Sequence, residues 1–172
     1  MNVKINKNII PNVFTFFNLT CGMLSIIFTL NSNFKIAALM IILAAFMDRY
    51  DGRIARRFDA VSPLGKELDS LCDLISFGVA PAVLSWSNFL INFGIIGYII
   101  SIIFPIAGAY RLARFNVTPF NNYFIGVPIT FAGFFLAVDN LIAISLPHNI
   151  LSAIIMLLLS YLMVCKIKFK KF

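Results

Sequence analysis

Six apolar runs, each about as long as a membrane-spanning helix, dominate the sequence. A spanning helix needs roughly 20 mostly apolar residues, because the hydrocarbon core of a bilayer is about 30 Å thick. The runs do not alternate polar and apolar residues, and a chain in lipid must satisfy its own backbone hydrogen bonds, so we expect helices and not barrel strands. The expected spans are residues 12–31, 34–57, 63–87, 90–112, 126–146 and 148–166. The sequence thus predicts an all-α polytopic integral membrane protein with a single domain, residues 1–172.

The composition excludes a water-soluble protein. Hydrophobic residues make up 60% of the chain and charged residues 12%, whereas soluble domains are about 45–50% apolar and about 25% charged. No hydrophilic stretch is long enough for a separate soluble domain, which argues against a multidomain soluble enzyme and against disorder. No small-residue cleavage site follows the first apolar run, so we expect that run to be a retained span.

The basic residues lie almost entirely on one side of the predicted topology. Of 14 Lys and Arg residues, all but Lys35 fall on the side that carries both termini. Because basic residues concentrate in cytoplasmic loops, both termini are predicted to be cytoplasmic, and the net charge of +7 faces an anionic leaflet. The basic C-terminal tail fits a topology anchor. Nucleic-acid binding is not expected of so apolar a chain.

Six of the seven acidic residues lie between positions 48 and 73. Ionised groups inside spans are costly and usually mark a functional site. Asp48 and Asp51 are three residues apart, and Asp69 and Asp73 are four apart, so each pair shares one face of its helix. An antiparallel hairpin with a short cytoplasmic turn brings the two pairs to similar depths. We therefore expect four carboxylates to converge.

Four converging carboxylates would repel one another by several kcal/mol at reduced dielectric, so a positive group must lie between them. Arg53 and Arg56 could contribute. A divalent cation, or a pair about 3.5–4 Å apart, fits hard oxygen donors better and favours Mg²⁺ or Mn²⁺. Gly52, Ala55 and Gly65 leave room for a phosphate. On spacing alone, the alternative is an Asp/Arg network that only ties two helices together.

The hairpin carries a family motif. Residues 48–73 read DRYDGRIARRFDAVSPLGKELDSLCD. This stretch resembles the signature of the CDP-alcohol phosphotransferases, D-x-x-D-G-x-x-A-R-x8-G-x-x-x-D-x-x-x-D, at all eight fixed positions. The resemblance implies a six-helix, usually dimeric membrane fold whose site opens to the cytoplasm. Such enzymes displace CMP from a CDP-linked donor with an alcohol.

The resemblance also implies roles for single residues. The metal ligands, for about two Mg²⁺ or Mn²⁺ ions per site, would be Asp48, Asp51, Asp69 and Asp73. Asp73 would also be the general base. The residues that border the CDP moiety would be Gly52, Ala55, Arg56 and Gly65. At the start of the first span, Pro11, Asn12 and Thr15 either contact the nucleotide, as in the family, or serve as ordinary helix-start residues.

Four further segments resemble the phosphatidylserine synthases within this family. They are PNVFTFFNLTCG (11–22), SFGVAPA (76–82), YRLARFN (110–116) and FIGVPIT (124–130). The last departs from the family, in which GLP is often followed by a further proline. The resemblance implies attack by the hydroxyl of L-serine on a CDP-diacylglycerol or CDP-linked ether lipid, and of the two routes, direct displacement or a covalent enzyme intermediate, we favour direct displacement. Arg111, Arg114 and Asn116 would bind the acceptor or the lipid phosphate, unless the arginines are only positive-inside anchors.

Two other functions remain open from the sequence. The same chemistry with glycerol 3-phosphate, inositol or inositol phosphate as the acceptor is the nearer one. A cation or proton transporter would need ionisable groups toward the external face, but the third span carries no charge after Asp73.

The three cysteines lie far apart and are expected to be free thiols, and a lone His148 does not suggest zinc. The expected partners are the CDP-lipid, L-serine, the bilayer of the cell membrane and a second copy of the chain.

Overall fold

The computed structural model describes residues 9–57, 62–117, 123–146, 149–166 and 168–170, with side chains for residues 12–50, 62–117, 126–146 and 149–166. The helices are α1 (Ile9–Leu30), α2 (Phe34–Arg57), α3 (Pro63–Asp73), the π-helix η1 (Leu74–Val79), α4 (Ala80–Asn88), the 3₁₀ helix η2 (Leu90–Phe93), α5 (Ile95–Val117), α6 (Ile129–Ser145) and α7 (Asn149–Val164). Two short strands are β1 (Tyr123–Ile125) and β2 (Lys168–Lys170).

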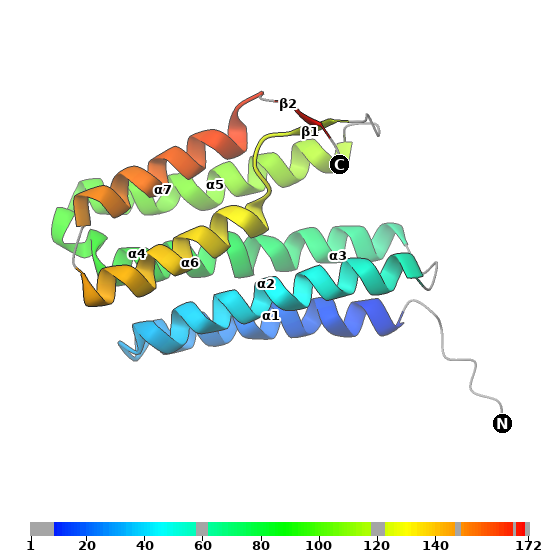
Figure 1. Cartoon of the computed structure of the whole chain (residues 1–172), viewed down its shortest axis with the longest axis horizontal. Coiled ribbons are helices and arrows are strands. Elements are labelled where there is room, and N and C mark those ends of the chain that lie inside the picture. The colour runs from blue at the N-terminus through cyan, green and yellow to red at the C-terminus, as the bar shows by residue number, and fades with distance from the viewer. Residues whose placement is uncertain (1–8, 58–61, 118–122, 147–148, 167, 171–172) are drawn as a thin grey trace.

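The long helices form an elongated bundle (Figure 1). α3, η1 and α4 follow one another as one helical rod from Pro63 to Asn88. α1 packs along α2, α2 also packs against α6, and α5 packs against α7. The π-helix η1 lies in the middle of the bundle, where it contacts α1, α5 and α6. Ser76, Phe77 and Gly78 of η1 are therefore buried inside the protein.

The start of α3 is fixed by a helix cap. Ser62 is the N-cap residue, and its hydroxyl accepts a hydrogen bond of 3.0 Å from the backbone N–H of Gly65. Pro63 occupies the first helical turn, where its missing N–H costs nothing. The sequence break at residues 62–63 thus becomes a defined helix start, about two turns before Asp69.

The π-helix was not expected, because the sequence predicts an uninterrupted helix over residues 63–87. Pro81 offers a physical reason: it has no N–H to donate to the preceding turn. The Ala80 N–H bonds to the carbonyl of Ile75, five residues back, which is the π-helical pattern. Such segments frequently lie at functional sites. This one begins directly after Asp73.

Two glycines allow neighbouring helices to approach η1. A Cβ at Gly22 of α1 would lie 2.7 Å from the Cα of Ser76, and one at Gly133 of α6 would lie 2.7 Å from the carbonyl oxygen of Phe77. Both distances are shorter than real contacts allow. Glycine at these positions brings α1 and α6 against the segment that follows Asp73.

The C-terminal segment is tied to the α5–α6 linker. β1 and β2 pair antiparallel, with Phe124 opposite Phe169, and the Val127 N–H donates to the carbonyl of Leu162 over 3.1 Å. The sequence analysis expects no strand and interprets the tail only as an anchor. Strands of three residues are too short for alternation to identify them.

The outer faces of the bundle are apolar. Side chains exposed by more than half include Phe16, Ile99, Ile106 and Tyr161. Among the residues that the structure describes, three helical segments are long and apolar enough to cross a membrane, namely Asn12–Leu30, Pro63–Asn88 and Ile95–Val117, and α6 and α7 are shorter apolar helices. These surfaces are those of a membrane protein.

The fourth predicted span differs most from its helix. The sequence predicts residues 90–112, whereas α5 begins at Ile95 and continues to Val117. Gly94, with φ of +56°, separates it from η2. The helix therefore includes Arg111, Arg114 and Asn116.

Candidate active site

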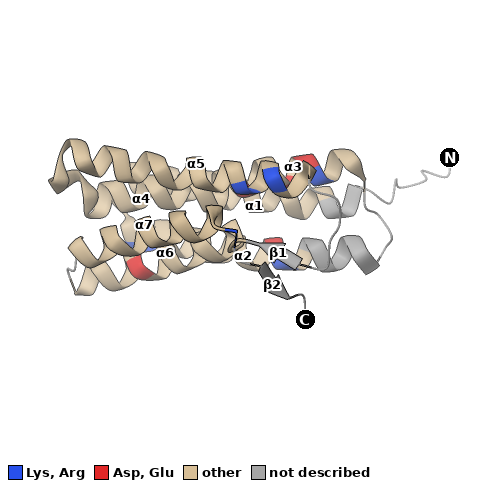
Figure 2. Cartoon of the chain, turned by 90° about the horizontal axis from the view of Figure 1, so that it is seen from above, with Lys and Arg blue, Asp and Glu red and all other residues tan. Residues whose placement is uncertain are grey.

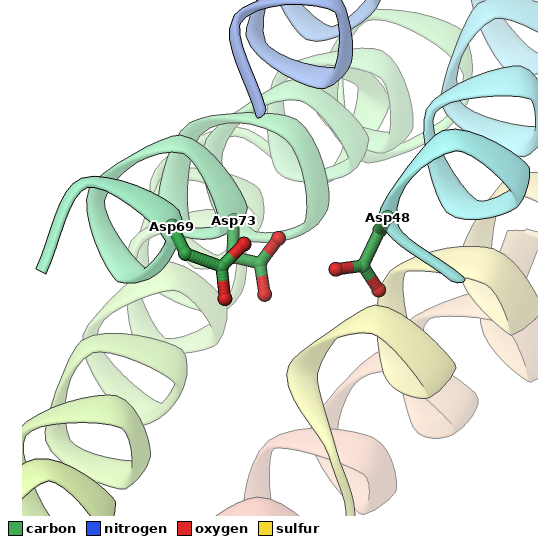
Figure 3. Close-up of side chains that lie close together, drawn as sticks. All are labelled: Asp48, Asp69 and Asp73. Atoms are coloured by element: carbon green, nitrogen blue, oxygen red, sulfur yellow. The ribbon is translucent and has the colours of Figure 1, made fainter. Parts of the chain in front are cut away.

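Three carboxylates meet between α2 and α3. Asp48, Asp69 and Asp73 each offer an oxygen, and these oxygens all lie within 4.8 Å of one another. Asp69 and Asp73 lie side by side, one turn apart on α3, and Asp48 points toward them from α2 (Figure 3). The structure therefore brings together three of the four carboxylates that the hairpin spacing singles out. Asp51 lies one turn further along α2, and its side chain is outside the described residues.

The cluster is largely removed from solvent. Asp73 is only 7% exposed, and Asp48 and Asp69 are half-buried. Oδ1 of Asp69 is buried and has no hydrogen-bond partner among the described residues. Three acidic groups this close together repel unless a positive charge compensates them. Hard oxygen donors with an unpartnered lone pair fit a divalent ion such as Mg²⁺ or Mn²⁺.

Two residues that the sequence analysis missed hold carboxylates of the cluster. The amide Nδ2 of Asn18, on α1, donates to Oδ1 of Asp73 over 3.0 Å. The side chain of Thr130, at the start of α6, hydrogen-bonds Asp48. Both lie inside the segments that resemble phosphatidylserine synthases, but neither was assigned a role there. A signal was available for Asn18, since an amide inside a long apolar run needs a polar partner.

The start of α1 lies beside the start of α3. A Cβ at Gly65 would be 3.5 Å from Oδ1 of Asn12, so the absence of a side chain at Gly65 leaves space next to this amide. Thr15, one turn further along α1, is buried. Asn12 and Gly65, which the resemblance assigns to nucleotide binding, therefore lie where α1 meets α3. The side chains of the remaining donor-site residues, Pro11, Gly52, Ala55 and Arg56, are outside the described residues.

Arg111 is the arginine next to the cluster. It is 9% exposed, and it interacts electrostatically with Asp73. Its Cζ lies 5.6 Å from the centre of the Phe115 ring. Nε has no hydrogen-bond partner in the described part of the chain. A buried guanidinium with an unused donor beside the carboxylates suits an anionic group of a substrate.

Arg114 and Asn116 bind other parts of the protein. The guanidinium of Arg114 donates to the carbonyl oxygens of Val164 and Met163, over 2.9 and 3.3 Å. Nδ2 of Asn116 donates to Oγ of Ser70 over 3.0 Å and to Oε2 of Glu67 over 3.2 Å. Asn116 thus joins the end of α5 to the turn of α3 that carries Asp69.

A known protein family matches most of the chain. A family model described as CDP-alcohol phosphatidyltransferase matches residues 8–165. The chain belongs to this family. The match includes both helices of the acidic hairpin as well as α1 and α5–α7, so it covers every element that contributes to the site. The family resemblance of the hairpin motif is thereby confirmed.

Several curated relatives carry closely related names. The CDP-diacylglycerol–serine O-phosphatidyltransferase of Bacillus subtilis is 43% identical over 96% of this chain and 92% of its own length. The protein of the same name from Methanocaldococcus jannaschii is 40% identical over 95% of this chain and 74% of its own length. The archaetidylserine synthase of Methanothermobacter thermautotrophicus is 32% identical over 94% of this chain and 70% of its own length.

Proposed function

We propose that this protein transfers a phosphatidyl group from a CDP-linked lipid to the hydroxyl of L-serine and releases CMP. The observation that carries the proposal is the convergence of Asp48, Asp69 and Asp73 within the hairpin that bears the family motif. The names of the relatives support serine as the acceptor. They also support a place in phospholipid synthesis.

The acidic cluster would bind the metal that the reaction needs. Asp48, Asp69 and Asp73, together with Asp51, offer the hard oxygen donors that Mg²⁺ and Mn²⁺ prefer. Two divalent ions bound there would neutralise the charge of the diphosphate and favour CMP as the leaving group. Asp69 contributes an oxygen with no other described partner, which suits a ligand.

Asp73 is the proposed general base. The serine oxygen attacks the lipid-linked phosphorus, and the bond from this phosphorus to the oxygen of CMP breaks in the same displacement. The hydroxyl proton passes to Asp73, and the electron pair of the broken bond leaves with CMP. Asp73 is buried and held by Asn18, and a fixed position is what a proton acceptor requires.

The donor would lie between α1, α2 and the start of α3. Asn12 lies beside Gly65 at the start of α3, and Thr15 is buried one turn further along α1. The family motif supports the same role for Gly52, Ala55 and Arg56 of α2, and the resemblance of residues 11–22 supports it for Pro11 of α1. We assign these seven residues to CDP binding.

The serine carboxylate is assigned to Arg111. This arginine is buried beside Asp73 and has an unused Nε donor, so it can bind a carboxylate next to the proposed base. Arg114 and Asn116 contribute to the acceptor region from the same end of α5. Their hydrogen bonds to α7 and α3 hold its walls in place.

We also propose that the six helical rods span the cell membrane with both termini and the site on the cytoplasmic side, and that the protein acts as a homodimer. Figure 2 shows most of the coloured charged positions of α2, α3 and α5 toward the end of the bundle where β1 and β2 lie, whereas Lys35 belongs to the first turn of α2. A concentration of basic residues at one end agrees with the positive-inside tendency. The site would then be open to L-serine in the cytoplasm.

The test is acceptor use by the purified protein. The protein in detergent is incubated with Mn²⁺, CDP-diacylglycerol and radiolabelled serine, glycerol 3-phosphate, inositol or inositol phosphate in separate reactions. We expect a lipid product in the reaction with serine and none in the reactions with the other three alcohols. Product with another alcohol and none with serine would overturn the acceptor assignment. A parallel series with a CDP-linked ether lipid determines which donor is used.

A further inference from the structure

Asn18 lies between the middle of α1 and the proposed base. Its side chain has no solvent exposure, and its Nδ2 donates to Oδ1 of Asp73 over 3.0 Å. A carboxylate only accepts hydrogen bonds, so the amide must turn its NH₂ group toward Asp73. Oδ1 of Asp73 is thereby bound by a residue of α1.

The backbone of Asn18 is fixed as well. Its carbonyl oxygen accepts a hydrogen bond of 3.0 Å from Oγ of Ser76 in η1. Gly22, one turn further along α1, permits the close contact with Ser76 on which this bond depends. α1 therefore holds both the side chain of Asp73 and the segment that follows it.

The amide oxygen of Asn18 distinguishes it from a simple interhelical link. Oδ1 is buried and has no hydrogen-bond partner in the regions that the structure describes. An unsatisfied buried amide oxygen is destabilising. A leucine would occupy a similar volume without that cost, so packing alone does not account for asparagine here.

Asn140 on α6 provides the comparison. It is also fully buried, but both ends of its amide are satisfied. Nδ2 donates to Oγ of Ser85 and to the carbonyl of Leu136, each over 2.8 Å, and Oδ1 accepts from Nδ2 of Asn88 over 3.2 Å. Asn140 therefore joins α4 to α6 as a structural residue, and it touches no carboxylate of the cluster.

We propose that Asn18 is a positioning residue that orients the carboxylate of Asp73 for metal binding, an inference that rests on the proposed metal-dependent function of the cluster. Its hydrogen bond fixes the rotation of the carboxylate and holds one oxygen away from competing partners. Without it, Asp73 turns freely and the cluster loses part of its preorganisation.

The test measures Mn²⁺ binding without substrates. Purified protein in detergent is titrated with Mn²⁺, and the free ion is quantified by its electron paramagnetic resonance signal. The variants are Asn18→Leu and Asn18→Ser, with Asn140→Leu as the matched control for loss of a buried asparagine. We expect both Asn18 variants to bind Mn²⁺ about 10- to 100-fold more weakly and Asn140→Leu to keep the wild-type affinity.

Size-exclusion chromatography and circular dichroism identify the folded variants. If Asn18→Leu does not fold, the result is taken from Asn18→Ser, which is the smaller change. Wild-type affinity in a folded Asn18 variant would overturn the positioning role and leave the proposed function intact. An equal loss in Asn140→Leu would overturn it too. If the wild-type protein itself does not bind Mn²⁺, the proposed metal site fails instead.

Discussion

Arg114 of α5 holds the C-terminal end of α7, with its Nη1 2.9 Å from the carbonyl oxygen of Val164. Nη2 donates in the same way to Met163, over 3.3 Å. The last carbonyls of a helix have no partner within the helix, and a cation there also interacts favourably with the helix dipole. A residue that the sequence suggests for substrate binding is therefore engaged in joining two helices.

This relationship predicts a stability defect in Arg114 variants. Arg114→Leu removes both hydrogen bonds and should lower the free energy of unfolding by about 1–2 kcal/mol. Arg114→Lys keeps the charge but not the paired donors, so it should lie between wild type and Arg114→Leu. Thermal melting in detergent measures the effect. An unchanged melting temperature in Arg114→Leu would show that the helix ends do not depend on this contact.

Arg111 variants should instead impair serine binding. Arg111 is buried beside Asp73, and lysine cannot reproduce a bidentate grip on a carboxylate. We expect Arg111→Lys to raise the KM for serine at least tenfold, or about 1.4 kcal/mol, and to change the KM for the CDP-lipid much less. Steady-state kinetics with each substrate varied in turn measures the two constants. A rise in both KM values to the same extent in Arg111→Lys would contradict a specific role at the acceptor.

Asp69→Asn should abolish turnover and stabilise the metal-free protein. The three carboxylates offer oxygens that lie within 4.8 Å of one another. Replacing the Asp69 carboxylate with a neutral amide removes one negative charge, so the repulsion within the cluster falls. The variant should melt at a higher temperature than wild type in EDTA. It should also lose the rise in melting temperature that Mn²⁺ gives the wild-type protein, because a bound ligand stabilises only the form that binds it.

Asp139→Asn is the control for this experiment. Asp139 is buried in α6, away from the cluster, and its replacement should leave the Mn²⁺ response and the turnover in place. Substantial activity of Asp69→Asn at saturating Mn²⁺ would exclude Asp69 as a ligand.

The helices could be predicted because long apolar runs leave few other structures possible in lipid. The second predicted span, residues 34–57, coincides with α2. The sequence did not reveal the π-helix after Asp73, since Pro81 could equally have produced a kink and the outcome depends on how α1 and α6 pack there. The sequence also did not show that α5 would begin only after Gly94, at Ile95.

Only the part of the site formed by residues close together in the sequence could be predicted. Asp48, Asp69 and Asp73 lie on one hairpin, and helix periodicity with an antiparallel turn is enough to bring them together. The contact of Asn18 with Asp73 joins residues 55 positions apart, and that of Thr130 with Asp48 joins α6 to α2. Such contacts depend on helix packing that no local spacing encodes.

The last prediction concerns the C-terminal tail, which the sequence suggests is an anchor. β2 pairs with β1 in the linker that leads to α6 and to Thr130, so the tail also orders this linker. Deletion of residues 167–172 should lower the melting temperature by about 2–4 °C, equivalent to about 1 kcal/mol in a chain of this size. Lys171→Ala removes a charge without removing the strand and should have little effect. Equal melting temperatures for the deletion and for Lys171→Ala would mean that the strand pair adds no stability and that the tail serves as an anchor alone.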